Sequence, residues 1–267
     1  MDTVGLIAGN RKFPLLFAQA ARRHNCRVVA IAIKGDTSRR INQYADTVYW
    51  LGLSEFSRMF AIFRREGVER VVMAGQISPR RLFSKEILKD EQLRHLLSTI
   101  QDQRADTIFG AIADKLEANG CELVDSTLYL KEYLPVRGLL TSRQPEEGVW
   151  EDISFGLMMA KNVASLDIGQ TVAVKNKAVV AVESLEGTDN LIRRAGRIAR
   201  GGITVVKVSK PRQDIRFDVP VVGLNTVKTL IRARGRCLAL EAEKTLFIDK
   251  DACLALAERH KLTIVSA

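Results

Sequence analysis

The sequence predicts an α/β protein with a Rossmann-like parallel-sheet N-terminal domain and a second α/β domain with a mixed sheet. In the first half, short β-branched segments alternate with amphipathic segments, as expected for parallel strands joined by helices. In the second half, two apolar segments meet at Asn176-Lys177, which predicts a hairpin and therefore antiparallel strands. The 267 residues are enough for two domains, and 46% hydrophobic with 27% charged residues is typical of a folded chain.

The first half begins with a predicted strand at Val4–Ala8 and a helix over Phe13–His24, whose last turn is basic. A second helix is expected over Ser54–Gly67, with Ser54 as its N-cap. Further strands are expected at Arg27–Ile33, Asp46–Leu51 and Arg70–Gly75, and further helices over residues 85–101 and 106–120.

The stretch Tyr133–Gly148 has two prolines, two glycines and little periodicity, so we expect it to connect domain 1–134 to domain 135–267. The second domain is expected to contain helices over residues 151–167, 188–200, 225–235 and 250–260, with Thr188 and Asn225 as N-caps of the middle two. Strands are expected in the hairpin 169–183, at 201–210 and, as two short strands, within 237–249.

The amino-acid composition favours some classes of ligand and disfavours others. The net charge is +10, which favours an anionic ligand, an anionic membrane surface or nucleic acid. No apolar stretch is long enough to span a membrane and the N-terminus does not resemble a signal peptide, so we expect a cytoplasmic protein. The four cysteines lack metal-site spacing and are expected to be reduced and buried. Aromatic residues are only 6% and no nucleic-acid motif is present, so no nucleic-acid partner is expected.

Two candidate ligand-binding turns follow predicted parallel strands. Gly9 and Asn10 come after the first strand, and Gly75 and Gln76 come after the fourth. Because ligands of open parallel sheets gather at the carboxyl ends of strands, we expect these residues to lie together. A plain strand-to-helix turn and a contact with phosphate or uridine remain alternatives for Gly9. A dinucleotide cofactor is disfavoured because Asn10-Arg11-Lys12 follows without a further glycine.

Acidic residues recur at steps of three in the second half, where a strand ends and a helix begins. Asp189 is expected in the first helical turn, where the helix dipole favours an acid. The helix dipole does not account for Glu183 and Glu186 in this way. For these two carboxylates, a solvated face and a metal or catalytic role both remain open.

The segment Lys210–Gly223 alternates acids and bases, with Asp214 and Asp218 interleaved with Arg212 and Arg216 in an apparently extended stretch. Carboxylates suit Mg²⁺ and guanidinium groups suit phosphate, so this pattern indicates a site that holds both. An exposed, salt-bridged loop is the alternative.

Taken in order, "GLIAGN…FP", "VVMAG", "DIGQTVAVK", "AVESLEGTD…IRRAG" and "RFDVPVVG" resemble the LpxI family of UDP-2,3-diacylglucosamine pyrophosphatases over nearly the whole chain. The resemblance implies Mg²⁺-dependent hydrolysis of UDP-2,3-diacylglucosamine to UMP and 2,3-diacylglucosamine 1-phosphate, a step of lipid A synthesis in Gram-negative bacteria. It also implies a homodimer, and the amphiphilic substrate implies peripheral contact with the cytoplasmic face of the inner membrane.

The resemblance places the family's acidic motif on Glu186–Asp189, its "DIGQ" on Asp167–Gln170, and its essential late aspartate on Asp218, with Asp214 as second choice. On this basis the catalytic candidates are Asp218, Asp214, Glu186 and Asp189. The Mg²⁺ ligands are expected among Glu183, Glu186, Asp189 and Asp218, which should converge on one pocket. Substrate contacts are expected from Gly9, Asn10, Gly75, Gln76, Gln170, Lys175, Thr188, Arg193, Lys207 and Arg216.

Two further hypotheses concern the binding site for the acyl chains and a non-catalytic function. The helical stretch Phe155–Ala164 is rich in methionine and large apolar residues, which suits either an acyl-chain groove or plain core packing. The alternative to an enzyme is a non-catalytic module that binds a nucleotide or RNA.

Overall fold

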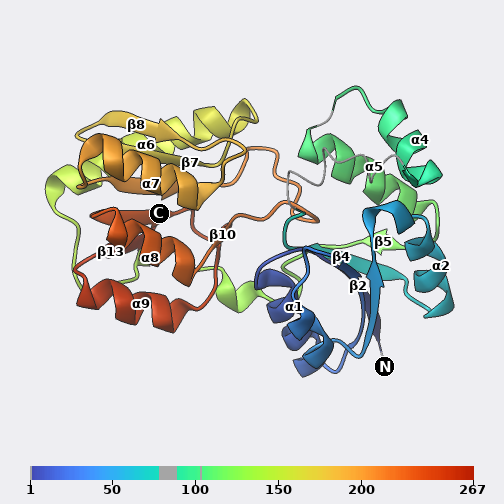
Figure 1. Ribbon diagram of the computed structural model, residues 1–267. Coiled ribbons are helices and arrows are strands. Elements are labelled where there is room, and N and C mark those ends of the chain that lie inside the picture. The colour runs from blue at the N-terminus through green and yellow to red at the C-terminus, as the bar shows by residue number, and fades with distance from the viewer. Residues whose placement is uncertain (1, 78–88, 103) are drawn as a thin grey trace. The chain divides into compact units, whose positions relative to one another are not determined.

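The computed structural model describes residues 2–77, 89–102 and 104–267, and the chain forms two compact units (Figure 1). The N-terminal unit contains Met1–Lys131 together with Asp214–Asp218. The C-terminal unit contains Glu132–Gln213 and Val219–Ala267. A short segment from late in the sequence therefore packs with the first unit, which the sequence did not predict.

The N-terminal unit is built on a parallel sheet with strand order β3-β2-β1-β4-β5. Its strands are β1 (Thr3–Ala8), β2 (Arg27–Ile33), β3 (Thr47–Leu51), β4 (Arg70–Ala74) and β5 (Glu122–Leu123). From β1 the chain moves outward to β2 and β3, then returns to place β4 on the other side of β1. This reversal is the topological switch point at which open α/β sheets bind ligands. The predicted Rossmann-like sheet is confirmed.

The central strands of this sheet are buried because helices pack against them. Helix α1 (Phe13–Arg23) packs on β1, β2 and β4, while α2 (Arg58–Arg65) and α5 (Ala105–Glu117) contribute to one apolar core with alternate residues of β2 and β4. Helix α4 (Glu91–Thr99) adds Leu93 and Leu96 to that core. Residues 85–88 of the helix predicted over 85–101 lie outside the described residues.

The C-terminal unit is built on a mixed sheet with order β6-β13-β11-β9-β7-β8. The strands β9 (Thr204–Lys207), β11 (Cys237–Leu240) and β13 (Thr263–Ser266) are parallel. The strands β6 (Gly138–Leu139), β7 (Thr171–Lys175) and β8 (Ala178–Val182) run antiparallel to their neighbours. A separate parallel pair joins β10 (Val221–Val222) to β12 (Leu246–Phe247). The predicted mixed sheet is confirmed, although β5, β6, β10 and β13 were not predicted.

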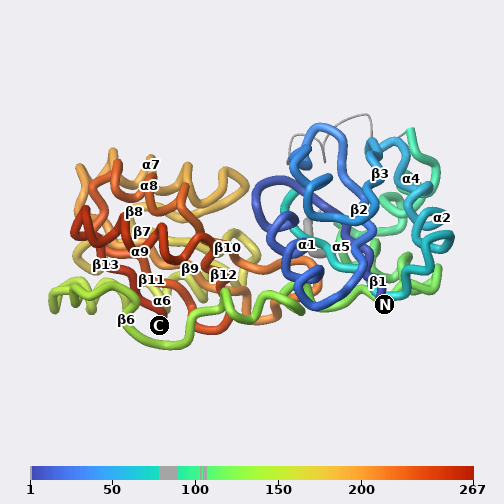
Figure 2. The backbone as a smooth tube through the Cα atoms, turned by 90° about the horizontal axis from the view of Figure 1, so that it is seen from below, coloured from blue at the N-terminus to red at the C-terminus, as the bar shows by residue number. Residues whose placement is uncertain are grey.

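Two apolar cores lie on the two faces of this mixed sheet. Helix α6 (Glu147–Ser165) covers one face, while α7 (Thr188–Ala199) and α8 (Leu224–Arg232) lie on the other (Figure 2). Helix α9 (Lys250–Arg259) packs beside α8 and on β13. Among the described residues, no helix is both long enough and apolar enough to cross a membrane.

The hairpin prediction is confirmed, because Asn176 and Lys177 both take positive φ, 52° and 58°, between β7 and β8. Three predicted N-caps are wrong. Leu53–Glu55 form a separate 3₁₀ turn, which the Glu55 N–H closes onto the Gly52 carbonyl, and α2 begins only at Arg58, past Ser54. Gly187 precedes α7 and Gly223 precedes α8, so Thr188 and Asn225 lie inside their helices.

Candidate active site

The two predicted turns of the N-terminal unit lie side by side at the switch point. The Gly9 N–H donates to the Ala74 carbonyl at 2.8 Å, and the Asn10 N–H donates to the Gln76 carbonyl at 2.8 Å. A Cβ on Gly9 would lie 2.6 Å from the Gln76 carbonyl oxygen, and one on Gly75 would lie 2.5 Å from that of Asn10. Glycine is therefore required at both positions, and the expectation that these four residues lie together is confirmed.

The Asn10 side chain marks this turn as a place for a polar ligand. Its Oδ1 atom is buried and has no hydrogen-bond partner. Arg11 takes φ 66°, so the turn reaches the left-handed region without the additional glycine of a dinucleotide motif. Helix α1 then starts at Phe13 without a side-chain cap, with its positive end at the turn. A buried amide oxygen beside a helix N-terminus can accept from a ligand N–H or O–H.

A buried polar cluster occupies one edge of the C-terminal sheet. Glu183 follows β8, Thr188 begins α7, and Lys207 ends β9 in register with Thr171 at the start of β7. Thr188 Oγ1 donates to Glu183 Oε1 at 2.8 Å and accepts from Lys207 Nζ at 2.7 Å. Lys207 Nζ also donates to Thr171 Oγ1 at 3.3 Å and lies 3.7 Å from Glu183 Oε2. The structure thus joins three predicted residues, Glu183, Thr188 and Lys207, to Thr171, which sequence reasoning missed.

One oxygen atom of this cluster, in the Glu183 carboxylate, has no hydrogen bond. Glu183 is only 8% exposed, yet its Oε2 atom makes no hydrogen bond. A buried acceptor without a donor is costly, so this oxygen is suited to a ligand hydroxyl, a water molecule or a hard cation. The Lys207 ammonium lies beside Glu183, and the N-terminus of α7 is also positive. Both would favour an anionic ligand group at this place.

The predicted "DIGQ" stretch packs its backbone against the strand end that carries Glu183. A Cβ on Gly169 would lie 2.1 Å from the Glu183 carbonyl oxygen, closer than any side chain permits. The Gln170 carbonyl accepts the Val208 N–H at 2.9 Å, and the Glu183 N–H donates to the Thr171 carbonyl at 2.9 Å. Asp167 adopts φ 57° and pairs with Lys210 at 2.6 Å. The need for glycine at position 169 was not predicted, although this residue lies inside the motif that the sequence singled out.

The other predicted acids of this region have separate partners. Glu186 pairs with Arg194, and this contact raises the pKa of the Arg194 guanidinium. Asp189 Oδ1 accepts from Thr226 Oγ1 at 2.9 Å, which links the first turns of α7 and α8. Within the described ranges, no group of three or more His, Cys, Asp or Glu side chains is placed to hold a metal ion. Glu186 and Asp189 thus have partners other than Glu183, and the expected convergence of Glu183, Glu186, Asp189 and Asp218 on one pocket stays a prediction.

Two predicted cations of the C-terminal unit lie away from the buried cluster. Lys175 ends β7 at the hairpin, at the opposite end of the strand from Thr171. Its Nζ donates to the carbonyls of Ala199 and Gly201 at 2.8 and 3.0 Å, so it caps the C-terminal end of α7. Arg193 is on the outer surface of α7, where its Nη1 donates to Asn190 Oδ1.

The acid–base segment of residues 214–218 is a turn, and the prediction of an extended stretch is wrong. The Asp218 N–H donates to the Asp214 carbonyl at 2.9 Å, and Asp214 Oδ1 accepts the Arg216 N–H at 3.0 Å. The Arg216 guanidinium grips the same carboxylate, with its Nη2 2.8 Å from Oδ2, and lies 3.6 Å from Glu117. The hydrogen bonds from Arg216 hold the pKa of Asp214 below its ordinary value despite partial burial.

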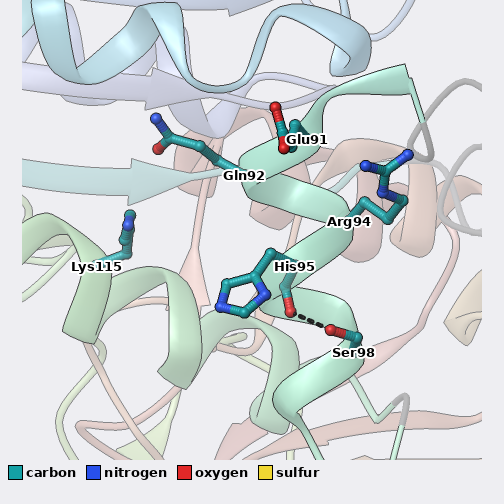
Figure 3. A pocket seen from close by; sticks show the side chains of 6 residues that line it. All are labelled: Glu91, Gln92, Arg94, His95, Ser98 and Lys115. Atoms are coloured by element: carbon teal, nitrogen blue, oxygen red, sulfur yellow. Dashed lines mark hydrogen bonds between the residues drawn. The ribbon is translucent and has the colours of Figure 1, made fainter.

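A polar hollow of about 510 Å³ lies elsewhere in the N-terminal unit, between α4 and α5 (Figure 3). Lys115 comes from α5, while the other lining residues, which include Arg94, His95 and Ser98, come from α4. The Ser98 hydroxyl donates to the His95 carbonyl at 2.7 Å. None of the predicted site residues lines this hollow.

Comparison with known proteins identifies the family. Residues 3–133 match the model of the LpxI N-terminal domain, and residues 136–265 match that of the LpxI C-terminal domain. The chain belongs to the LpxI family. The resemblance inferred from the motifs is thus confirmed over both halves of the sequence.

A curated LpxI relative matches nearly the full length. The UDP-2,3-diacylglucosamine pyrophosphatase LpxI of Caulobacter vibrioides is 30% identical over 268 residues, which is 97% of this chain and 95% of the relative. The LpxI C-terminal model includes Asp214–Asp218, although these residues pack with the N-terminal unit.

Two solved structures with other names are only distantly similar to this chain. A glycinamide-RNase-transformylase T from Mycobacterium tuberculosis is 13% identical at a TM-score of 0.24, over 68% of this chain and 44% of that one. A biotin carboxylase subunit of pyruvate carboxylase is 15% identical at a TM-score of 0.29, over 75% of this chain and 42% of that one. At these scores the similarity carries no argument about the fold or function of the LpxI chain.

Proposed function

We propose that this protein is a hydrolase that cleaves the pyrophosphate bond of UDP-2,3-diacylglucosamine, giving UMP and 2,3-diacylglucosamine 1-phosphate. The observation that carries the proposal is the full-length similarity to an LpxI pyrophosphatase, with both family domains in order. The two polar sites, one at the switch point and one at the edge of the mixed sheet, have the chemistry that a nucleotide-linked diphosphate requires.

The residues fit Mg²⁺ only as an ion shared with the substrate. Mg²⁺ commonly uses one or two carboxylates together with water and substrate phosphates, rather than a cage made of protein ligands. Glu183 Oε2 would supply one such ligand, and its buried position without a hydrogen bond supports this assignment. A role for Asp218 as a ligand rests on the family resemblance alone. When bound, Mg²⁺ would polarise the phosphoryl group and neutralise its charge.

Asp218 suits the role of general base better than Asp214. Three Arg216 nitrogen atoms donate to the Asp214 carboxylate, and the pKa of that carboxyl is lowered, so Asp214 is a poor proton acceptor. In this proposal Asp218 takes a proton from the attacking water, and Lys207 offsets negative charge on the diphosphate. Asn10, Gly75 and Gln76 would contact the nucleotide at the switch point.

We further propose that water attacks the β-phosphorus. Its oxygen then forms the new P–O bond, while the bond between the β-phosphorus and the bridging oxygen breaks and UMP leaves with that oxygen. In ¹⁸O-labelled water, the label should appear in 2,3-diacylglucosamine 1-phosphate and not in UMP. Label in UMP would contradict attack at the β-phosphorus while leaving the hydrolase assignment in place.

The helix expected to hold acyl chains is mostly used for packing. Phe155, Leu157 and Met159 pack against the core between α6 and the sheet, and Met158 alone of the large apolar side chains in this stretch is more than half exposed, at 52%. The acyl-chain site is therefore not assigned to this helix. Homodimer formation and contact with an anionic membrane surface remain proposals, based on the family and on the net charge of +10.

The direct test uses purified protein with UDP-2,3-diacylglucosamine and Mg²⁺, and follows UMP by chromatography. We expect UMP release that EDTA abolishes and added Mg²⁺ restores. Release that is unaffected by EDTA would contradict the Mg²⁺ requirement alone. Absence of release, with RNA retained through high-salt washes, would contradict the hydrolase and favour the binding module.

A further inference from the structure

Ser126 joins the N-terminal unit to the turn that carries Asp218. It lies after β5 in a loop whose shape is fixed by Asp125, because the Asp125 carboxylate accepts the N–H and hydroxyl of Thr127, both at 2.7 Å. Ser126 is fully buried at 0% exposure. Its N–H and its hydroxyl both donate to the carbonyl of Ile215, at 3.1 and 2.8 Å. One buried residue thus holds one carbonyl of the turn with two donors.

Two further contacts dock the same turn on the N-terminal unit. The rings of Phe217 and Phe109 are 5.7 Å apart and inclined by 38°, and both pack against the core beneath α2 and α5. Arg216 lies 3.6 Å from Glu117 of α5. The Asp218 N–H closes the turn onto the Asp214 carbonyl, so Asp218 is tied by this hydrogen bond to the turn that contains Ile215. Holding the Ile215 carbonyl therefore fixes where Asp218 stands relative to this unit.

We propose that Ser126 is a positioning residue for the hydrolysis: its hydroxyl holds the Ile215 carbonyl and so fixes the Asp218 carboxylate. This inference rests on the proposed function. Because the Ser126 N–H also donates to the Ile215 carbonyl, that carbonyl keeps one hydrogen bond when the hydroxyl is removed. What the hydroxyl adds is a restraint on direction, and a general base depends on direction.

The kinetic test is Ser126→Ala, with Ser57→Ala as the matched control. Ser57 is in the same unit and its hydroxyl also donates, to Asp90 at 2.9 Å, away from the turn. We expect Ser126→Ala to lower kcat about two- to tenfold, the range of one ordinary hydrogen bond, with KM changed less than twofold. Ser57→Ala should leave both parameters unchanged. An unchanged kcat, or equal losses in the two variants, would overturn the proposal.

A double-variant measurement separates positioning from general loss of structure. If Ser126 acts through Asp218, Ser126→Ala should not slow the residual turnover of an Asp218→Ala enzyme any further. Additive losses would show that Ser126 acts elsewhere. Phe217→Leu weakens the same docking without touching Asp218, and should lower kcat in the same way as Ser126→Ala.

A second measurement does not depend on activity. Arg212 precedes the turn and Arg216 lies within it, so trypsin cleavage after these residues reports how often the turn leaves the N-terminal unit. We expect faster cleavage after these arginines in Ser126→Ala than in the wild type or in Ser57→Ala. Equal rates would overturn the anchoring by Ser126 even if the wild type releases no UMP. Conversely, an inactive wild type with faster cleavage of Ser126→Ala would contradict the proposed function alone.

Discussion

Lys207 Nζ lies 3.7 Å from Glu183 Oε2, with the two side chains only 9% and 10% exposed. Thr188 completes the contact, because its hydroxyl donates to the carboxylate and accepts from the ammonium. A buried ion pair adds little to stability compared with apolar residues of the same shape, since both charges lose their hydration. Its presence at a sheet edge is better explained by a need for charge at that place, which is where we propose the diphosphate binds.

Replacing one member of this pair should destabilise the C-terminal unit. Lys207→Met leaves the Glu183 carboxylate buried without its counter-charge, which should lower the free energy of unfolding by about 3–5 kcal/mol. The measurement is urea denaturation followed by circular dichroism. Lys177→Met is the matched control, because Lys177 pairs with Glu151 at 57% and 52% exposure and should cost less than about 1 kcal/mol. Equal costs for the two variants would contradict the buried pair.

Gly169→Ala should disrupt the same edge through the backbone. The new methyl group would lie 2.1 Å from the Glu183 carbonyl oxygen, so either the "DIGQ" turn or Glu183 must move. We expect a loss of more than about 2 kcal/mol by the same denaturation assay. Gly148→Ala in α6 is the control, since its Cβ meets nothing within 4 Å, and it should stabilise by up to about 1 kcal/mol. A harmless Gly169→Ala would show that the turn is not held against Glu183.

Asp218→Ala tests the proposed base directly. The variant should fold and still bind UDP-2,3-diacylglucosamine, while kcat falls about 10²- to 10⁴-fold, the usual contribution of general base catalysis. Binding is measured by calorimetry and turnover by UMP release. Asp251→Ala, an exposed aspartate in the first turn of α9, is the matched control and should retain wild-type turnover. Turnover of Asp218→Ala at the wild-type rate would remove Asp218 from the mechanism.

Acid should weaken the N-terminal unit in part through Glu55. The Gly52 N–H and the Lys34 ammonium lower the pKa of Glu55 from 4.5 to about 2. A carboxylate whose pKa is depressed in the folded state contributes stability above pH 4.5 and loses that contribution as the pH falls towards 2. The thermal midpoint of the wild type should therefore fall more steeply over this interval than that of Glu55→Gln. Parallel curves for the two proteins would contradict this role.

Local patterns predicted most of the elements, because strand and helix periodicity are properties of neighbouring residues. The hairpin at Asn176-Lys177 and the meeting of Gly9 with Gly75 followed from turn chemistry and from the topology of parallel sheets. The helix starts were less predictable. The Thr188 hydroxyl, which we expected to cap α7, is instead taken by Glu183 and Lys207.

Long-range contacts were beyond the sequence. Ser126 and Ile215 are 89 positions apart, and no local pattern indicates that a turn from the second half packs on the first. Thr171 was missed for the same reason, because its link to Lys207 depends on the register of two antiparallel strands. The carboxylates were recognised as important by spacing and resemblance, but spacing along the chain did not reveal that Glu186 and Asp189 have separate partners.

The docking of residues 214–218 on the N-terminal unit means that the two halves are not interchangeable parts. A gene divided between the two family models, after residue 133, would leave Ser126 and Phe109 in a fragment that lacks Ile215 and Phe217. The other fragment would expose the ring of Phe217, which packs against Phe109 in the intact protein. Chimeras that exchange halves between relatives must therefore take residues 214–218 from the same relative as the N-terminal unit. Otherwise the proposed catalytic Asp218 would lie on a turn whose contacts with that unit are mismatched.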